Sequence, residues 1–414
     1  MATASTLSET ANRQDRPPTG LLVTLTPLPP DALERALANL AAAFPTQAIQ
    51  VATPDPVPPN IADSMQFRAF TYMPAVQSAG GWILTAADFL NTYKLVQEQG
   101  TSGGLLLGPE AQTITPQALA ALSSGLISGS ADLTTARYAL GPRDGLVNSA
   151  ILYPVTRALF GTRARYPLAI DLAFSRRMAE RLASAAQRFT ASGQSSALLW
   201  PVAEAAAAGL SVTEVDVGIR AIPAPDSADL NSILAHVAGS LFADIEVKAS
   251  FWQRARLAYS PKDAAAHGQA TAAQEQGAQL PDPPDIQPML DSFRIAYSNL
   301  HELWSLVLPP NSLLGLKKLS LMSAVEFRMP DALWARIVYD FVLAYRLRTI
   351  NRGHLMGALT PLYLAWVASH LRLASSTGHG ALAPEAHIEA LAAAFETDKP
   401  YLVSRWRWPD RFNP

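Results

Sequence analysis

Residues 131–182 read ADLTTARYALGPRDGLVNSAILYPVTRALFGTRARYPLAIDLAFSRRMAERL, and no other stretch of the chain says more about its fold. Asp171 lies in it between an apolar run and a segment with the composition of a helix. Ser175 is the better candidate to cap the free amide groups of that helix, because serine side chains accept from the first turn. Asp171 is therefore left available for a functional site.

Arginines gather around this acid, and their guanidinium forks suit the oxygens of phosphates and carboxylates. They are Arg143, Arg157, Arg163 and Arg165. A second interpretation stays open for three of them. Arg157, on an apolar helix, could extend to solvent, and Arg163 and Arg165 could belong to an exposed loop.

Outside this stretch, the N-terminal half alternates apolar runs with helical patterns. Residues 20–26 (GLLVTLT) and 105–107 are expected to be buried strands. Asp31 and Thr85 are expected to begin helices, and Thr115 precedes a proline that suits a first helical turn. Such alternation predicts a parallel sheet that helices cover on both faces.

The expected domain plan has four parts. Residues 1–19 form a polar disordered tail without the apolar core of a signal peptide, and residues 20–258 form the α/β domain. Residues 259–288 are rich in Ala, Gln, Gly, Asp and Pro, which is typical of a flexible linker. Residues 289–408 carry apolar side chains on a helical repeat and should form an α-helical C-terminal domain.

Composition excludes several classes of protein. The 414 residues carry a formal net charge of only −2, so a nucleic acid is not expected as a partner. There is no cysteine, so any metal must have oxygen or imidazole ligands, and the histidines lack the spacing of a zinc site. No apolar run has the roughly 20 residues of a membrane span, and we expect a cytoplasmic protein. A homo-oligomer is left open.

Two segments carry a resemblance to a known family. The run AILYPVTRALFG at 150–161 and the run YPLAIDLAFSRRMAERL at 166–182 resemble the acceptor side of bacterial glycosyltransferases with the GT-A fold. The similar enzymes are the glucosyl-3-phosphoglycerate and mannosylglycerate synthases. Residues 229–252 and 395–406 resemble their helical appendage. The resemblance implies a Rossmann-like α/β domain that binds a nucleotide-diphospho-sugar, followed by helices.

The implied donor site departs from the family pattern. Where the family has an Asp-x-Asp element for Mg²⁺ or Mn²⁺, this chain has LLLGPEAQTITP, in which Gly108 and Glu110 would face the donor and Glu110 is the single carboxylate. A second family acid aligns with Leu198, and a metal-binding histidine aligns near Ile222. Arg220 remains there as a cation for the donor phosphates. The metal site is therefore expected to be degenerate.

The implied acceptor site keeps its acid. Asp171 lies where the family has Gly-Gly-Asp or Gly-Gly-Glu, and it would face the acceptor hydroxyl as the catalytic residue. Ala169 and Ile170 replace the glycines, which predicts a narrower and more apolar pocket. The remaining candidates for acceptor binding are Tyr138, Arg143, Arg157 and Arg165.

Two functions follow from these observations, and the sequence leaves catalytic turnover open. In the first, the protein transfers a hexose from a nucleotide-diphospho-sugar to a small acceptor with little dependence on a metal. In the second, it is a non-catalytic pseudo-glycosyltransferase that acts as a binding or scaffold protein. Nucleotide triphosphatases, dehydrogenases and hydrolases are disfavoured because their glycine-rich loops and nucleophile elbow are absent from the sequence.

Overall fold

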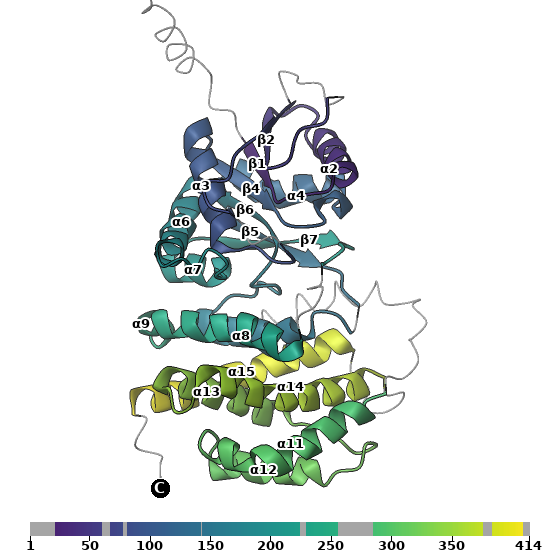
Figure 1. Cartoon of the computed structure of the whole chain (residues 1–414), viewed down its shortest axis with the longest axis vertical. Helices are drawn as coiled ribbons and strands as arrows, with labels where there is room; N and C mark the ends of the chain where they lie inside the picture. Colours follow the sequence, from purple (N-terminus) through teal and green to yellow (C-terminus); the bar gives the residue numbers. More distant parts are fainter. Residues whose placement is uncertain are drawn as a thin grey trace, which may run out of the picture. The chain divides into compact units, whose positions relative to one another are not determined.

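The computed structural model describes residues 21–59, 67–77, 81–141, 143–223, 229–255, 285–375 and 383–408, and these form two compact units (Figure 1). The first unit takes its residues from Met1–Ala139 and Leu168–Asp226, and the second from Leu140–Pro167 and Ser227–Pro414. The tail predicted at 1–19 and most of the linker predicted at 259–288 lie outside the described residues.

The first unit is an α/β sandwich around a seven-stranded sheet with the order β3-β2-β1-β4-β6-β5-β7. Its strands are β1 Leu21–Leu25, β2 Ile49–Thr53, β3 Phe67–Thr71, β4 Gly103–Leu107, β5 Leu133–Tyr138, β6 Asp171–Ser175 and β7 Val212–Gly218. Its helices are α2 Pro30–Ala43, α3 Ala86–Gln99, the 3-10 helix η1 Ala111–Thr113, α4 Pro116–Ile127, α6 Arg176–Ala191 and α7 Pro201–Ala208.

The sheet is mixed, so the prediction of an all-parallel sheet was wrong at one strand. β6 runs antiparallel to both of its neighbours, β4 and β5, whereas the other neighbouring strands pair in parallel. As a result, the first residue of β6, Asp171, pairs with Leu107, the last residue of β4. The start of β6 therefore lies at the edge where the parallel strands end.

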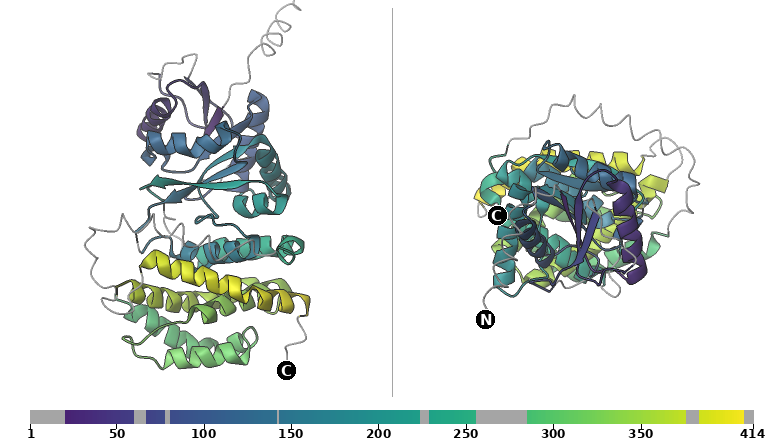
Figure 2. Two further views of the ribbon diagram at one scale, coloured as in Figure 1. Left: turned by 180° about the vertical axis from the view of Figure 1, so that it is seen from behind. Right: turned by 90° about the horizontal axis from the view of Figure 1, so that it is seen from above.

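Helices cover both faces of this sheet. α3 packs on β1, β4 and α6, while α4 packs on β5, β6, β7 and α2. Figure 2 gives further views of this unit, in which α2, drawn in purple, lies on the other side of the sheet from α6. This arrangement agrees with the predicted α/β class.

Local capping chemistry explains several helix starts. The Thr115 and Ser175 hydroxyls accept from the amides of Ala118 and Met178, each at 3.3 Å, as the sequence predicted. Thr85 also begins its helix as expected. Asp31 was predicted to cap its helix, but it lies inside the first turn of α2, and the N-cap residue, Pro29, has no side-chain acceptor.

The second unit consists of helices. They are the π-helix η2 Asn148–Leu152, α5 Tyr153–Phe160, α8 Leu230–Val247, α9 Ala249–Trp252, α11 Gln287–Ser305, α12 Pro310–Ser320, α13 Asp331–Leu347, α14 Arg352–Ser375 and α15 Pro384–Arg407. Trp304, Trp334 and Trp366 are buried in its core. None of the helices in the described ranges is long and apolar enough to cross a bilayer.

The boundary between the units differs from the predicted one at residue 258. α8 packs on α13 and α14, and α5 packs on α15, so both belong to the helical unit. The apolar residues of α8, such as Leu234, Leu241 and Ile245, are completely buried by this packing. The sequence could not reveal this grouping, because an apolar helical face does not specify which partner covers it.

Candidate functional site

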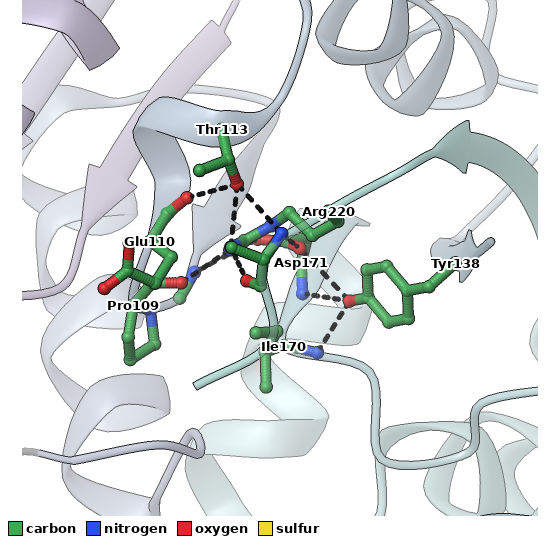
Figure 3. A network of polar contacts seen from close by, with 9 residues as sticks. Pro109, Glu110, Thr113, Tyr138, Ile170, Asp171 and Arg220 are labelled. Atoms are coloured by element: carbon green, nitrogen blue, oxygen red, sulfur yellow. Dashed lines mark hydrogen bonds and ion pairs between the residues drawn. The ribbon is translucent and has the colours of Figure 1, made fainter. Parts of the chain in front are cut away.

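The predicted site residues of the first unit meet at the edge where β1 and β4 end (Figure 3). Asp171 opens β6 beside Leu107, and Gly108 follows β4 directly. Tyr138 closes β5, and Arg220 follows β7 after two residues. The edge at which parallel strands end is the usual ligand-binding edge of an α/β sheet.

A bulge directs Arg220 back across this edge. The pairing of β5 with β7 shifts its register between Arg137 and Tyr138, so that Tyr138 lies opposite Gly218. Gly218 has φ 70°, a left-handed conformation that glycine adopts without steric cost, and its amide donates to Asp216 Oδ1 at 2.8 Å. The turn brings the Arg220 side chain into the interior rather than to solvent.

Asp171 and Arg220 form a completely buried ion pair. Arg220 Nε donates to Asp171 Oδ2 at 2.9 Å, and Arg220 Nη2 donates to Asp171 Oδ1 at 2.9 Å. Both side chains have 0% exposed surface. This parallel two-bond geometry is the strongest way for a guanidinium group to bind a carboxylate. The predicted catalytic acid is thus bound to the predicted donor-binding cation.

Further donors complete the surroundings of the carboxylate. The Gly108 amide donates to Asp171 Oδ1 at 3.3 Å, and the Tyr138 hydroxyl donates to Asp171 Oδ2 at 3.1 Å. The same hydroxyl accepts from the amides of Ile170 and Asp171 at 3.1 and 3.2 Å. Burial, and then the charge of Asp171, raise the pKa of Tyr138 well above its ordinary value. Tyr138 therefore remains a neutral donor.

Arg220 is satisfied as well. Its Nη2 donates to the Pro109 carbonyl and its Nη1 to the Ala221 carbonyl, each at 2.7 Å. Nη1 also lies 3.5 Å from Thr113 Oγ1. Sequence analysis missed Thr113 and the Pro109 carbonyl, because neither residue type carries a signal for guanidinium binding. The pair is enclosed by a complete set of partners, which is what a buried charge requires.

Gly108 is in close contact with Ile170, the residue that precedes β6. A Cβ at Gly108 would lie 2.8 Å from the Ile170 carbonyl oxygen and 2.9 Å from Ile170 Cβ. Ile170 is only 5% exposed. The close approach of Ile170 therefore explains why residue 108 is a glycine. Ile170, which the resemblance places where the family has a glycine, fills the space beside Gly108 with its branched side chain.

Glu110 occupies the turn after β4 in an unusual conformation. Its φ of 63° is left-handed, a region that costs a non-glycine residue about 1 kcal/mol or more. Its Oε2 accepts from Gln112 Nε2 at 2.7 Å, and its carbonyl accepts from Thr113 Oγ1 at 2.8 Å. It is half-buried at the start of η1.

The acids at this edge do not fit a divalent cation. Within the described part of the chain, no three side chains of the Asp, Glu, His or Cys type come together as a cation site. The oxygens of Asp171 accept from four donors, and Glu110 is a single carboxylate. Mg²⁺ and Mn²⁺ need several oxygen ligands, and these two acids do not supply them.

Leu198, which the resemblance aligns with a second family acid, is buried, and the neighbouring Glu204 binds Arg181 Nε at 2.8 Å. Trp200 is 1% exposed and therefore packs in the interior.

Three of the predicted acceptor-binding arginines belong to the second unit. Arg157 donates to Glu389 and, through Nε at 2.9 Å, to Glu396, while Arg165 Nε donates to Glu385 at 2.9 Å. These acids all lie on α15. Arg143 is exposed in the segment before η2. Tyr138, the acceptor candidate of the first unit, donates to Asp171.

Comparison with known proteins gives similarities in structure only. No protein-family model matches the chain, and no curated protein matches it. Among solved structures, it is similar to glucosyl-3-phosphoglycerate synthase from Mycobacterium tuberculosis in complex with phosphoglyceric acid, with 12% identity, a TM-score of 0.32, and coverage of 59% of this chain and 85% of that one.

Two further structures give values of the same size. The same enzyme in complex with Mn²⁺, uridine diphosphate and glucosyl-3-phosphoglycerate has 13% identity and a TM-score of 0.34, and the match covers 59% of this chain and 85% of that one. A structure described as a mycobacterial protein has 12% identity, a TM-score of 0.33 and coverage of 59% and 79%. This enzyme group is the one that the sequence resembles, and at such low identity the similarity concerns the fold alone.

Proposed function

We propose that this chain is a non-catalytic protein of glycosyltransferase-like architecture, which acts by binding partners rather than by transferring a hexose. The observation that carries the proposal is the Asp171–Arg220 ion pair, in which both side chains have 0% exposure. A general base must reach the acceptor hydroxyl, and a donor-binding cation must reach a phosphate. Neither is free to do so while the two groups bind each other.

The neighbourhood of the ion pair supports the same proposal. Ile170 packs against Gly108, where a nucleotide diphosphate would approach the backbone. The acids needed to hold Mg²⁺ or Mn²⁺ around that diphosphate are missing from the described part of the edge.

The test measures the binding of UDP-glucose and GDP-mannose to the whole chain, with and without Mn²⁺. Binding is detected by the change in melting temperature and by calorimetry. We expect neither donor to change the melting temperature, because no group at the described edge can receive the phosphates. A rise that depends on the metal would contradict the proposal. Pyrophosphate serves as a control for charge alone.

Hexose transfer remains the second candidate because Gly108, Glu110, Asp171 and Arg220 do converge on one edge of the sheet. Hexose transfer would require Arg220 to break its ion pair with Asp171 and bind the donor phosphates instead. The Asp171 carboxylate would then be exposed. A screen for donor hydrolysis and transfer separates the two candidates. Activity that is lost in Asp171→Asn, and retained in a control with Asp31→Asn on α2, would favour the enzyme. The cytoplasmic location and the oligomeric state remain predictions from the sequence.

A further inference from the structure

The second unit contains a cavity that the proposed function does not use. It has a volume of about 490 Å³ and is lined by the residues after α9 and by the last turns of α15. Small-molecule sites in proteins have volumes of about 300–1,000 Å³. The side chains that concern us in its wall are Gln253, Lys399, Val403, Ser404, Arg407 and Trp408.

Aromatic packing fixes the two walls of the cavity. Trp252 of α9 meets Trp406 of α15 edge to face, with ring centroids 5.0 Å apart. Trp252 Nε1 donates to the Ile245 carbonyl at 2.9 Å, and the Arg346 guanidinium lies 4.2 Å from the centroid of the Trp406 ring. Such contacts make the cavity a preformed feature of the helical unit.

One stripe of α15 faces the cavity. Lys399, Val403 and Arg407 are spaced by four residues, and side chains at this spacing lie on the same face of a helix. The stripe therefore presents a cation at each end and an apolar side chain between them. Ser404 adds a hydroxyl group to the same wall.

The cations of this stripe form no salt bridge with an acid among the described residues. Lys399 is 6% exposed, and its Nζ donates to the carbonyls of Ala255 and Leu159 at 3.0 and 3.4 Å. An ammonium group has three donors, so one donor of Lys399 is not used by these bonds. The acid one turn before it, Glu396, is bound by Arg157 instead.

Arg407 also has hydrogen-bond donors that its bond to Gln253 does not use. Its Nε donates to Gln253 Oε1 at 3.2 Å, and a guanidinium group has five donors in all. The side chain is exposed, and Trp408 beside it has 60% of its surface exposed. Large aromatic side chains with so much exposed surface are typical of binding surfaces when they border a cavity.

We propose that this cavity is a binding site for a small organic anion that carries a flat apolar body. The phosphate or carboxylate group of the ligand accepts the unused donors of Arg407, and Lys399 adds a second positive charge to the same wall. The flat body packs on Trp408 and Val403, while Ser404 and Gln253 add polar contacts. The site belongs to the helical unit, so it does not depend on whether the edge at Asp171 is open.

The test compares four probes on the whole chain by calorimetry at low salt. The two organic anions are 1-naphthyl phosphate and 1-naphthoate, which separate the phosphate from the carboxylate. The two controls are 1-naphthol, which has the body without the charge, and inorganic phosphate, which has the charge without the body. We expect one of the organic anions to bind at least tenfold more tightly than either control.

Variants locate the site. Arg407→Gln and Trp408→Ala change exposed side chains, so folding is not at risk, and each should weaken binding at least tenfold. Lys317→Gln, an exposed cation of α12, is the matched control and should leave binding unchanged. Failure of both organic anions to bind at 1 mM would overturn the proposal. It would be overturned equally if 1-naphthol bound as tightly as the anions, or if Arg407→Gln and Trp408→Ala bound like the parent.

Discussion

The closed edge of the first unit and the α15 stripe of the second unit differ in the partners of a buried charge. In the first unit, Asp171 and Arg220 neutralise each other, and every atom of the pair that needs a partner has one. In the second unit, Arg157 and Arg165 pair with acids of α15, whereas Lys399 donates to carbonyl groups and forms no salt bridge among the described residues. A buried charge that is paired with an opposite charge closes a site, whereas a buried charge without a salt bridge can still bind a ligand. Composition alone cannot distinguish the two cases.

Two more titratable groups are buried in the second unit, and one of them, Asp340, has its Oδ1 3.6 Å from Arg405 Nη1. Asp340 is 1% exposed and accepts from Tyr401 at 2.6 Å, but its Oδ2 has no hydrogen-bond partner in the described structure. Burial raises the pKa of Asp340 to about 7. His370 is stacked on Trp366 and lies 2.7 Å from His387, Nδ1 to Nδ1, and burial lowers its pKa to about 4.

The largest effect is expected from breaking the matched pair. Arg220→Met leaves the carboxylate of Asp171 buried without its cation, which should cost about 3–5 kcal/mol of the free energy of unfolding. Chemical denaturation of the parent and the variant measures this loss. The double variant Asp171→Leu with Arg220→Met removes both charges and should recover more than half of it. Equal stability of the parent and Arg220→Met would mean that the pair is not closed in solution.

Asp340 and His370 should make the stability of the helical unit depend on pH, with opposite signs. The folded pKa of His370 is below its ordinary value of 6.5, so its contribution is present above pH 6.5 and is lost as the pH falls toward 4. The folded pKa of Asp340 is above its ordinary value of 3.8, so its contribution is present below that value and is lost as the pH rises toward 7. Each slope is at most about 1.4 kcal/mol per pH unit.

Two variants separate these slopes. In His370→Gln, lowering the pH from 6.5 to 4 should stabilise the helical unit relative to the parent. In Asp340→Asn, which keeps an acceptor for Tyr401, the same change should destabilise it relative to the parent. Melting temperatures at half-unit steps of pH measure both effects. The same pH dependence in both variants as in the parent would show that neither group titrates between pH 4 and 7.

A smaller effect is expected from removing the buried cation. Burial lowers the pKa of Lys399 to about 8, so the charged form is penalised in the folded protein at pH 7. Lys399→Met removes that penalty and also removes two hydrogen bonds to carbonyl groups. We expect the first effect to be larger, so the free energy of unfolding should rise by about 1 kcal/mol. Loss of stability in this variant would indicate that the two carbonyl bonds outweigh the penalty. Arg407→Gln, at the exposed end of the stripe, should change stability by less than about 0.5 kcal/mol.

The smallest effect concerns two residues other than glycine that have a left-handed backbone in the described part of the chain, one in each unit. Glu110 has φ 63° and Arg348, at the end of α13, has φ 54°. Glu110→Gly and Arg348→Gly should each stabilise by about 0.5 kcal/mol, because glycine adopts this conformation without strain but loses more entropy on folding. Thermal denaturation measures the change. A loss on Glu110→Gly larger than on Arg348→Gly would show that the Glu110 side chain stabilises its turn through Gln112.

Much of the local structure could be predicted from the sequence, because its causes are local. The Thr115 and Ser175 hydroxyls cap the helices that follow them, and residues 20–26 contain the strand Leu21–Leu25. The candidates Gly108, Tyr138, Asp171 and Arg220 came from the resemblance to a known family. The arrangement of an α/β part and a helical part follows from the chain alone. Residue types and their spacing carry this information.

Only the tertiary structure decided how those residues are used. The direction of β6 is not encoded in its apolar run, since a buried strand has the same composition in either direction. That direction brings Asp171 to Arg220, 49 positions further along the chain, and turns a candidate base and a candidate phosphate ligand into one closed pair. The same holds for Lys399, whose carbonyl partners come from α5 and from the residues after α9. The free energy of a buried charge depends on neighbours that are remote in sequence, and only folding brings those neighbours together.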